Sequence, residues 1–556
     1  MNHHIEKMIA QTVVDLYNLD EVIEIAIPEE QFGDFSTNIA LKLARVLSRP
    51  PRDIAQEIID KINISDVDFI ESIDIAGAGF INITLTNQAL IDLIDEKPST
   101  SLKGQVIVAE YSDPNPFKTL HAGHLYTSIV GDVIANLLEN GGAEVHRVNF
   151  GGDVGMHVAK NIWAIIRTIG GNEDATKLND IDEDRRTEWL SQCYVNGNTA
   201  YETDDQAKQQ IKLLNGRIYE ISAGQEHETE LAKIYWTCRQ WSYDYFNAFY
   251  SRLNIGFEKY YPESEVVELG LKTVKENIPE VYQESQGAII FDGEKYGLYT
   301  NVFINSEGLP TYAAKDVGLI IKKWQDYEFD RSLIITSSEQ LDYMKVVLKS
   351  VEQFRPDLAA ASMHLSHGVV KLSGGLKMSS RLGNILTATD VLDAAAEANA
   401  QNHVGDDQVT IGAVKYAFLK QRIGGDIIYE PKESVSIEGN SGPYLQYAHA
   451  RAKNILNKVE TEVTTLDAKE FTKEERSLIK KLGEYSSVIE LATEELKPHY
   501  VCTYLYELAQ TFNRFYENNR VIGDPKQSFR IILVTLYAER LSNGLKILGI
   551  ASPDKM

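Results

Sequence analysis

Hydrophobic spacing near residue 100 predicts a strand, a helix and a second strand. Short apolar runs at 105–112 and 145–150 are typical of strands buried in a parallel sheet. Between them, apolar residues recur every three or four positions and share one helical face: Leu125, Ile129, Val133, Ile134, Leu137 and Leu138. The pair Gly141-Gly142 ends this helix. This order is that of a βαβ unit, so we expect an α/β fold.

The same pattern divides the rest of the chain. Residues 1–100 combine helical spacing with a strand-like stretch at 79–85, and sheet-like runs return at 332–338 and 363–372 after a mostly helical block. Amphipathic repeats then continue to the end, as in a helical bundle. The expected parts are an α+β N-terminal domain at 1–100, a Rossmann-like parallel-sheet domain at 101–385 with a helical insertion at about 158–300, a helical connector at 386–435 and an all-helical domain at 436–556.

Net charge limits the classes of partner. The 556-residue chain has a formal net charge of −26, which argues against general affinity for nucleic acid. The excess acid lies upstream, because residues 431–556 hold 17 Lys and Arg against 17 Asp and Glu, whereas the first 430 hold 38 against 64. The last domain could therefore present a basic face.

Apolar runs and cysteines limit location and metal content. No apolar run reaches the roughly 18 residues of a membrane span, so we expect a cytoplasmic protein without membrane attachment. Cys193, Cys238 and Cys502 are too far apart for a CxxC zinc pattern and too few for a disulfide framework. We expect no protein-bound structural metal, and a monomer.

The segment NPFKTLHAGH at 115–124 contains candidate chemistry. His121 and His124 could bind zinc, although no third ligand is evident, or they could lie in a core. A third interpretation is a phosphate site, because Gly123 leaves the backbone open at a helix start, where free N–H groups attract an anion. The preceding strand puts this site at the carboxyl edge of a parallel sheet, where such folds bind nucleotides.

A second segment, GGLKMSSR at 374–381, is a glycine-led loop with two cations and two hydroxyls. Taken alone, such a segment is more often a solvated surface loop. In this order and with sheet elements between them, the two segments together resemble the HIGH and KMSKS motifs of class I aminoacyl-tRNA synthetases.

Within that class, the chain resembles arginyl-tRNA synthetases over essentially its whole length. The resemblance rests on GDFSTNIALKLA at 33–44, EYSDPNPFKTLHAGHL at 110–125, PTYAAKDVG at 310–318, KMSSRLGN at 377–384, EGNSGPYLQYAHAR at 438–451 and the C-terminal LGIASPDKM. GPYLQYAHAR is the most specific stretch, since HAGH-like motifs also occur in small nucleotidylyltransferases. The resemblance implies that L-arginine, ATP and tRNA(Arg) form arginyl-tRNA(Arg) through an arginyl-adenylate, with Mg²⁺ arriving with ATP.

The resemblance also implies roles at the ATP site. The implied ATP contacts are His121, Gly123, His124, Lys377, Met378, Ser379 and Ser380. Lys118 matches a family lysine before the motif and adds a cation. Such a site works by positioning and neutralising a crowded anion, without a covalent nucleophile. The catalytic residues expected are His121, His124, Lys377 and Lys118.

An arginine substrate needs planar acceptors for its guanidinium group, ideally carboxylates. Tyr312 and Asp316 match the family's substrate contacts and, four positions apart, share one helical face; alone they would be interpreted as a surface turn. The arginine contacts implied are Glu110, Asn115, His124, Tyr312, Asp316 and Gln340. Asn82 is a weaker candidate from the N-terminal domain.

The tyrosine-rich last domain suits an anticodon-binding role, since Arg, Lys and Tyr bind phosphates and stack on unpaired bases. The tRNA contacts expected are Tyr444, Gln446, Tyr447, Arg451, Tyr537 and Arg540, with His449 on the same element as the first four. A bundle core would also use such tyrosines.

Several positions depart from the family pattern. Ser380 replaces the second lysine of KMSKS, Tyr126 stands where the family often has Arg, GDWG reads GDVG at 152–155, and an Asp-Ala-Leu-Arg-type element reads YAER at 537–540. Two alternatives remain. A non-catalytic tRNA-binding paralogue is opposed by the retained ATP motifs, and a synthetase for another amino acid is opposed by the acidic substrate contacts.

Overall fold

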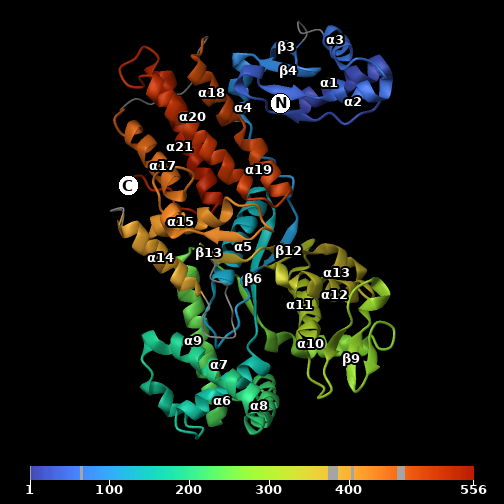
Figure 1. Cartoon of the computed structure of the whole chain (residues 1–556), viewed down its shortest axis with the longest axis vertical. Coiled ribbons are helices and arrows are strands. Elements are labelled where there is room, and N and C mark those ends of the chain that lie inside the picture. Colours follow the sequence, from blue (N-terminus) through green and yellow to red (C-terminus); the bar gives the residue numbers. More distant parts are fainter. Residues whose placement is uncertain (1, 63–66, 374–385, 402–405, 460–469) are drawn as a thin grey trace.

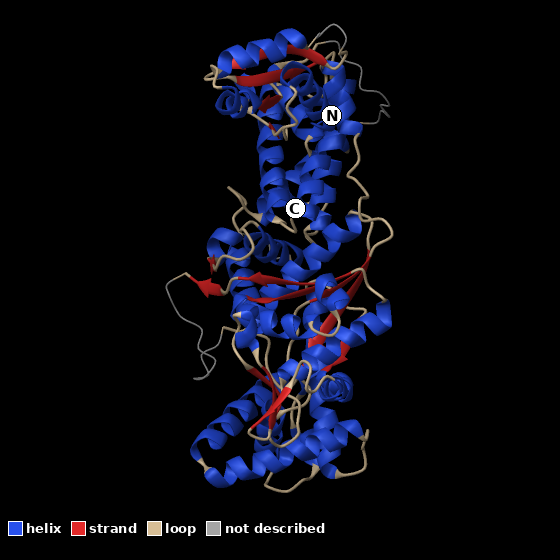
Figure 2. Ribbon diagram, turned by 90° about the vertical axis from the view of Figure 1, so that its right-hand side faces the viewer, coloured by secondary structure: helices blue, strands red, loops and turns tan. Residues whose placement is uncertain are grey.

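The computed structural model describes residues 2–62, 67–373, 386–401, 406–459 and 470–556. The domains follow one another along the long axis of the molecule (Figure 1). The N-terminal domain lies at one end, a helical bundle comes next, a parallel sheet lies at the centre, and two further lobes lie at the far end (Figures 1 and 2). The bundle therefore lies between the N-terminal domain and the central sheet.

The N-terminal domain is an antiparallel sheet packed against helices. Its elements are β1 (Ile25–Ala26), β2 (Phe35–Thr37), β4 (Phe80–Leu85) and β3 (Ile70–Ala76), in this sheet order, with α1 (Asn2–Tyr17), α2 (Ile39–Leu47) and α3 (Pro51–Lys61). Ile5, Ile9 and Val13 of α1 are fully buried, which agrees with the helical spacing predicted for residues 1–100. Asn82 is buried in β4 and accepts a hydrogen bond from Ser36 Oγ (2.7 Å). This position in the N-terminal core corrects our weaker prediction that Asn82 reaches the substrate.

A five-stranded parallel sheet forms the centre and confirms the predicted fold class. Its strands, in sheet order, are β12 (Ser362–His367), β11 (Arg331–Ser337), β5 (Val106–Glu110), β6 (Glu144–Gly151) and β7 (Lys259–Pro262). The chain places β6 on one side of β5 and later β11 on the other, with Glu110 opposite both Val148 and Ile334. The order of connection thus reverses at β5, and ligands bind such sheets at the strand ends beside this reversal.

The predicted insertion at about 158–300 is not outside the sheet along its whole length, because it contains one strand of the central sheet. Four helices lie between β6 and β7: α6 (Met156–Thr168), α7 (Arg186–Thr203), α8 (Asp205–Ala223) and α9 (Glu230–Arg252). The sheet then resumes, because β7 pairs in parallel with β6. Only four residues long and without an apolar run, KYYP gave too weak a strand pattern to be recognised.

A second lobe follows β7 and combines helices with a small antiparallel sheet. Its elements are α10 (Glu263–Glu276), β8 (Gln283–Ser285), β9 (Ala288–Phe291), β10 (Asn301–Ile304), α11 (Tyr312–Tyr327), α12 (Leu341–Glu352) and α13 (Pro356–Ala361). Helices α10 and α11 pack so closely that a Cβ on Gly270 would lie 2.1 Å from Ala314 O. This close packing fixes α11, which begins with the predicted substrate contact Tyr312.

The last domain is helical, as predicted, whereas the predicted helical connector at 386–435 also contains a strand, β14 (Ile427–Tyr429), which pairs with β13 (Val370–Leu372) just upstream of the connector. The connector comprises α14 (Ala388–Gln401), α15 (Asp407–Leu419), β14 and α16 (Pro431–Ser434), and the bundle comprises α17 (Gly442–Leu456), α18 (Lys473–Gly483), α19 (Tyr485–Glu494), α20 (His499–Asn518) and α21 (Gln527–Ile547). Arg476 of α18 binds the N-terminal domain, donating to Asp34 Oδ2 (2.7 Å) and to Leu85 O (3.0 Å). The two domains also meet where α18 packs on α4 (Asn87–Asp95). No helix in the described part of the chain is long and apolar enough to cross a membrane.

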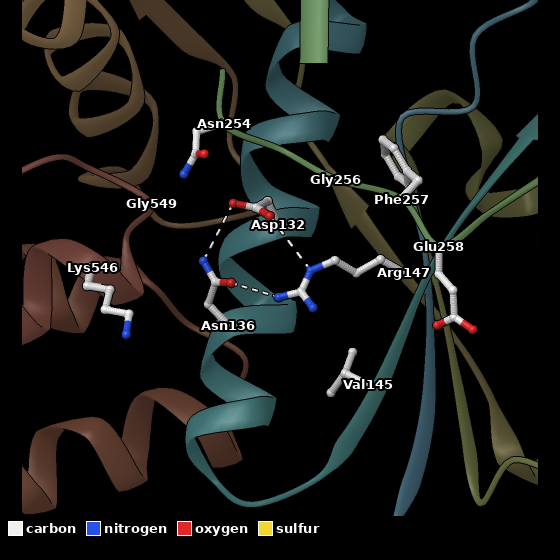
Figure 3. Close-up of a pocket in the computed structure, with 10 residues that line it drawn as sticks. All are labelled: Asp132, Asn136, Val145, Arg147, Asn254, Gly256, Phe257, Glu258, Lys546 and Gly549. Atoms are coloured by element: carbon white, nitrogen blue, oxygen red, sulfur yellow. Dashed lines mark hydrogen bonds and ion pairs between the residues drawn. The ribbon is translucent and has the colours of Figure 1, made fainter. Parts of the chain in front are cut away.

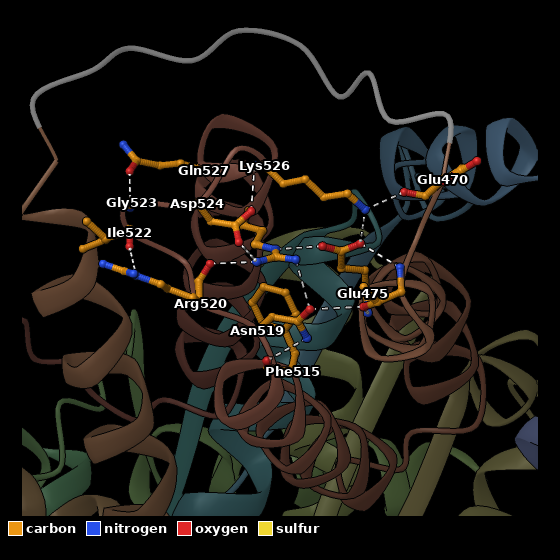
Figure 4. Close-up of polar contacts among 12 residues, drawn as sticks. Glu470, Glu475, Phe515, Asn519, Arg520, Ile522, Gly523, Asp524, Lys526 and Gln527 are labelled. Atoms are coloured by element: carbon orange, nitrogen blue, oxygen red, sulfur yellow. Dashed lines mark hydrogen bonds and ion pairs between the residues drawn. The ribbon is translucent and has the colours of Figure 1, made fainter.

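A buried ion pair joins two bundle helices (Figure 4). Glu475 is fully buried near the start of α18, where it accepts hydrogen bonds from Arg530 Nε (2.8 Å), Lys526 Nζ (3.1 Å) and the Thr472 N–H (2.8 Å). Burial opposes ionisation, but these three donors hold the pKa of Glu475 below its usual value. The carboxylate thus connects α18 to the start of α21.

A polar cavity of about 510 Å³ lies between the central sheet domain and the end of the bundle (Figure 3). Asp132 of α5 (Ala122–Asn140), Arg147 of β6 and Lys546 of α21 are among its lining residues. Behind it, buried Lys415 donates a hydrogen bond to Gly549 O (2.8 Å). None of the predicted ATP or arginine contacts that the structure describes lines this cavity, so we place it at the interface between the two domains.

Candidate active site

The segment after β5 turns sharply before α5 begins. Ser112, Asp113 and Phe117 have φ values of 76°, 48° and 67°, in the left-handed region that residues with side chains rarely adopt. Tyr111 packs flat against α5, where a Cβ on Gly131 would lie 2.1 Å from its ring. The chain therefore returns at once over the end of β5, and HAGH lies at the carboxyl edge of the sheet, as predicted.

His121 and His124 form a reciprocal cap at the start of α5. The His124 N–H donates to His121 Nδ1 (3.3 Å), and the His121 N–H donates to His124 Nδ1 (3.2 Å). The rings stack with centroids 3.7 Å apart. Because each Nδ1 accepts a hydrogen bond, a neutral ring must have its proton on Nε2. Both histidines thus expose the same kind of donor, an Nε2–H.

The surroundings keep both rings neutral. Burial, assisted by the charge of Lys118 and by His367, lowers the pKa of His121 to about 4. Burial also lowers the pKa of His124 well below its usual value, with smaller contributions from His121 and Lys118. At neutral pH the pair therefore supplies uncharged hydrogen-bond donors beside the positive end of α5. This arrangement suits a phosphate, and no cluster of three or more His, Cys, Asp or Glu side chains in the described ranges is arranged to hold a metal.

Two of the acidic residues beside the histidines are neutralised by lysines. Glu110, at the end of β5, pairs with the buried Lys323, which also donates to Ser332 Oγ (3.0 Å). Glu263, at the start of α10, pairs with the buried Lys315. The predicted arginine contact Glu110 therefore already has a cationic partner.

Two further carboxylates have no such partner. Neither Asp113 nor Asp316 forms an ion pair with a lysine or arginine among the residues that the structure describes. Partial burial and the charge of Glu110 raise the pKa of Asp113 well above its usual value, although the Phe150 N–H donates to its Oδ1 (2.8 Å). Burial likewise raises the pKa of Asp316 to about 7, while the hydrogen bond from Tyr343 opposes the rise. This raised pKa is typical of a carboxyl group in an acidic pocket that lacks its cation.

The remaining predicted arginine contacts lie on α11, in the segment after β5 and in the segment after β11. Tyr312 and Asp316 are on one face of α11, as their spacing predicted, and Tyr312 is 53% exposed. Asn115 Oδ1 accepts a hydrogen bond from the Gly152 N–H (2.9 Å), which orients its amide beside the end of β6. Gln340 is exposed in the short helix η6 (Ser338–Gln340) that follows β11. The sheet edge therefore gathers residues from four separate segments.

Sequence patterns missed Asp113, Glu263 and Tyr343. The only available signal was the position of Asp113 inside the EYSDPNP stretch. The GDVG stretch at 152–155 has a structural role: Asp153 is fully buried and accepts hydrogen bonds from the Ser264 N–H (2.9 Å) and Arg239 Nε (2.9 Å). It therefore holds α9 and α10 against the end of β6.

The loop that contains Lys377, Met378, Ser379, Ser380 and Arg381 lies outside the described residues. Its predicted contacts with ATP accordingly stay predictions.

Three predicted tRNA contacts are directed into the protein. Gln446 is fully buried and donates to Ala551 O (2.9 Å), and Tyr537 is fully buried with its ring 3.8 Å from that of Phe512. Arg540 donates to Ile94 O (2.5 Å) and lies over the Tyr485 ring. These side chains stabilise the C-terminal tail, the bundle core and the contact with α4, and their predicted contacts with tRNA stay predictions.

Three other candidates remain at the surface. Tyr447 is 47% exposed on α17, Arg451 lies over the ring of Tyr516 at 4.8 Å, and Tyr444 accepts a hydrogen bond from Asn513 Nδ2 (2.9 Å). His449 is buried, with Nδ1 2.9 Å from Pro553 O. Tyr444, Tyr447, Arg451, Asn513 and Tyr516 define what we call the α17–α20 patch.

Comparison with known families accounts for nearly the whole chain. The arginyl tRNA synthetase N-terminal domain matches residues 2–85, the catalytic domain of class I tRNA synthetases (R) matches residues 86–430, and the DALR anticodon binding domain matches residues 445–556. This chain belongs to the arginyl-tRNA synthetase family. The histidine pair and the carboxyl groups of Asp113 and Asp316 all lie in the segment that matches the family's catalytic domain.

Known relatives match this chain over nearly its full length. The arginine–tRNA ligase of Clostridium perfringens is 28% identical over 99% of this chain and 100% of its own length. That of Fusobacterium nucleatum is 30% identical over 96% of this chain and 95% of its own length. The arginyl-tRNA synthetase structure of Thermus thermophilus, 24% identical, matches the fold with a TM-score of 0.81 over 100% of both chains.

Proposed function

We propose that this chain activates L-arginine with ATP and transfers it to tRNA(Arg). The observation that supports this most directly is the arrangement at one sheet edge of two neutral imidazole donors and two carboxylates that have no ion-pair partner among the described residues. The imidazoles suit the phosphates of ATP. The carboxylates suit an amino acid that has both a guanidinium and an α-ammonium group.

Charge matching favours arginine in this pocket. After Lys323 and Lys315 are paired with Glu110 and Glu263, Asp113 and Asp316 are left. Arginine brings two cationic groups, one at each end of the molecule, so it would neutralise both. We assign the guanidinium to Asp316 with Tyr312, and the α-ammonium to Asp113 with Asn115 and Gln340. A bound cation would restore both carboxyl groups to their ionised form.

The chemistry follows from this arrangement. An oxygen of the arginine carboxylate attacks the α-phosphorus of ATP, and the bond to the β-phosphate oxygen breaks, which gives arginyl-adenylate and pyrophosphate. The Nε2–H groups of His121 and His124 donate to phosphate oxygens as negative charge accumulates there, and Lys118 and Lys377 add positive charge. ATP enters as its Mg²⁺ complex. In the second step a ribose hydroxyl of tRNA attacks the activated carbonyl, and AMP leaves.

We infer that the tRNA reaches across the molecule to the bundle. The α17–α20 patch offers aromatic rings and a guanidinium group to unpaired bases. The N-terminal domain lies beyond the bundle and offers a second surface for the same RNA.

Pyrophosphate exchange with a panel of amino acids, with tRNA(Arg) present, tests this proposal. We expect exchange with arginine and about 10⁴-fold less with lysine, because a site built for a planar guanidinium group leaves its polar groups unpaired around an ammonium. Lysine or glutamate exceeding arginine would indicate a different synthetase. Background exchange with every amino acid would indicate a non-catalytic tRNA-binding paralogue.

A further inference from the structure

We propose that Tyr194, on helix α7 of the insertion, is a positioning residue that holds Lys118 at the ATP site. The contact is between a cation and an aromatic ring: Lys118 Nζ lies 4.1 Å from the centroid of the Tyr194 ring. This inference rests on the proposed function, because it gives Lys118 a phosphate to neutralise. It assigns a catalytic purpose to a helix that lies outside the nucleotide-binding sheet.

The insertion also fixes the backbone on both sides of Lys118. Three hydrogen bonds do this: the Phe117 N–H donates to Ser242 Oγ of α9 (2.9 Å), the Thr119 N–H donates to Ser191 Oγ of α7 (3.1 Å), and Asn161 Nδ2 of α6 donates to Phe117 O (2.7 Å). Asn161 Nδ2 also donates to Leu190 O (3.0 Å), which ties α6 to α7 beside Ser191. The helix that supplies Tyr194 is therefore held in register with the segment that contains Lys118.

The partner of Lys118 is an aromatic ring, which does not neutralise the lysine charge as a carboxylate would. Lys315 and Lys323 are buried against Glu263 and Glu110, so their charges are cancelled within the protein. Within the described ranges, no carboxylate forms an ion pair with Lys118. An aromatic face attracts an ammonium group through its quadrupole and brings no formal negative charge. Tyr194 thus restrains the long side chain while its full positive charge stays available for a phosphate.

Lys118 also lies close enough to the histidine pair to act on the same anion. Its charge is one of the causes that lower the pKa of His121 and of His124. The positive charge of Lys118 and the Nε2–H donors of both histidines can therefore act on one phosphate. Held in advance, it need not be ordered when negative charge develops on the phosphate.

Variants at Tyr194 test the proposal through arginine-dependent pyrophosphate exchange. Tyr194→Phe keeps the aromatic face, and we expect it to retain wild-type kcat. Tyr194→Leu removes the face, and we expect kcat to fall about five- to tenfold while KM for arginine stays unchanged. In a Lys118→Ala background, Tyr194→Leu should have almost no further effect, because the two residues would act as one unit.

Tyr201 provides a matched control on the same helix. Its ring lies 4.1 Å from Lys160 Nζ, the same distance as in the Tyr194 contact, and Lys160 also approaches Glu202 (3.8 Å). Tyr201→Leu should leave exchange unchanged, and melting curves of all variants should show that the insertion is folded. Three outcomes would overturn the proposal: equal loss in Tyr201→Leu, equal loss in Tyr194→Phe, or a full further loss in the Lys118→Ala background. Absence of exchange in the wild type would instead contradict the proposed function.

Discussion

Tyr343 of α12 donates a hydrogen bond to Asp316 of α11, and this contact connects two helices at the end of β11. It opposes the strong effect of burial, which still raises the pKa of Asp316 to about 7. The carboxyl group therefore gains its proton at a much higher pH than an exposed aspartate does. The affinity for the substrate should consequently depend on pH in a predictable direction.

We expect KM for arginine to rise as pH falls below about 7. The folded pKa of Asp316 is raised, so lowering the pH protonates the carboxyl and removes the charge partner of the guanidinium group; above about pH 8 the group is ionised and KM should level off. The limiting slope is about tenfold per pH unit for one proton. Exchange kinetics between about pH 5.5 and 8.5 measure this, and a slope smaller by one proton in Asp316→Asn would identify the group, because Asp113 still titrates in that variant.

Loss of either free carboxylate should weaken arginine use far more than ATP use. Asp316→Ala leaves the guanidinium group unpaired in the pocket, so we expect KM for arginine to rise by about 100-fold or more, as when one partner of a buried charge pair is removed. Asp113→Asn keeps the size of the side chain and should raise the same KM about tenfold through loss of the α-ammonium partner. Unchanged arginine kinetics in Asp113→Asn would show that Asp113 does not contact the substrate.

The histidine pair should act through kcat. Replacing His121 with Ala removes one Nε2–H donor and one half of the reciprocal cap, and we expect kcat to fall about 10²- to 10³-fold, as for loss of a single donor to a developing anion. His227 is exposed in the turn between α8 and α9, so His227→Ala serves as a control that should behave as wild type. Because both pKa values are depressed, neither imidazole should produce a titration in kcat near pH 6.5.

Glu475→Gln should destabilise the bundle. The change removes one of the two carboxylates that pair with the buried Arg530 and leaves Asp524 (3.2 Å) as its only described charge partner, so we expect a loss of about 2 kcal/mol and a lower Tm. The folded pKa of Glu475 is depressed, so its contribution is present above the unfolded pKa of about 4.3 and is lost as pH falls through the lower folded pKa. The difference in Tm between the variant and wild type should therefore shrink in acid. Exposed Glu517, changed to Gln, should alter stability by less than about 0.5 kcal/mol.

The α17–α20 patch should determine affinity for tRNA. Arg451→Ala removes the guanidinium group that lies over Tyr516, and we expect KM for tRNA(Arg) to rise about tenfold with arginine activation unchanged. Tyr537→Phe removes a hydroxyl that is buried and without a hydrogen-bond partner in the described structure, so it should leave this KM unchanged. A larger effect of Tyr537→Phe would indicate that Tyr537 contacts the tRNA.

Sequence by itself determined the order of the main elements and the place of the ATP motif. The reason is physical: the runs that form β5 and β6, and the one-sided apolar face of α5, are local patterns that need no distant partner to be recognised. His121 and Gly123 follow a strand and open a helix, so their position at the sheet edge was predictable.

Only the tertiary structure decided which of the candidate polar residues are buried and which already have a charge partner. Burial of Gln446 and Tyr537, the partial burial of Asp113 and Asp316, and the pairing of Glu110 with Lys323 depend on segments that lie far apart in the chain. Spacing along one helix cannot give these charge partners. The placement of Tyr194 against Lys118 is of the same kind, since it arises from packing of α7 against the segment before α5.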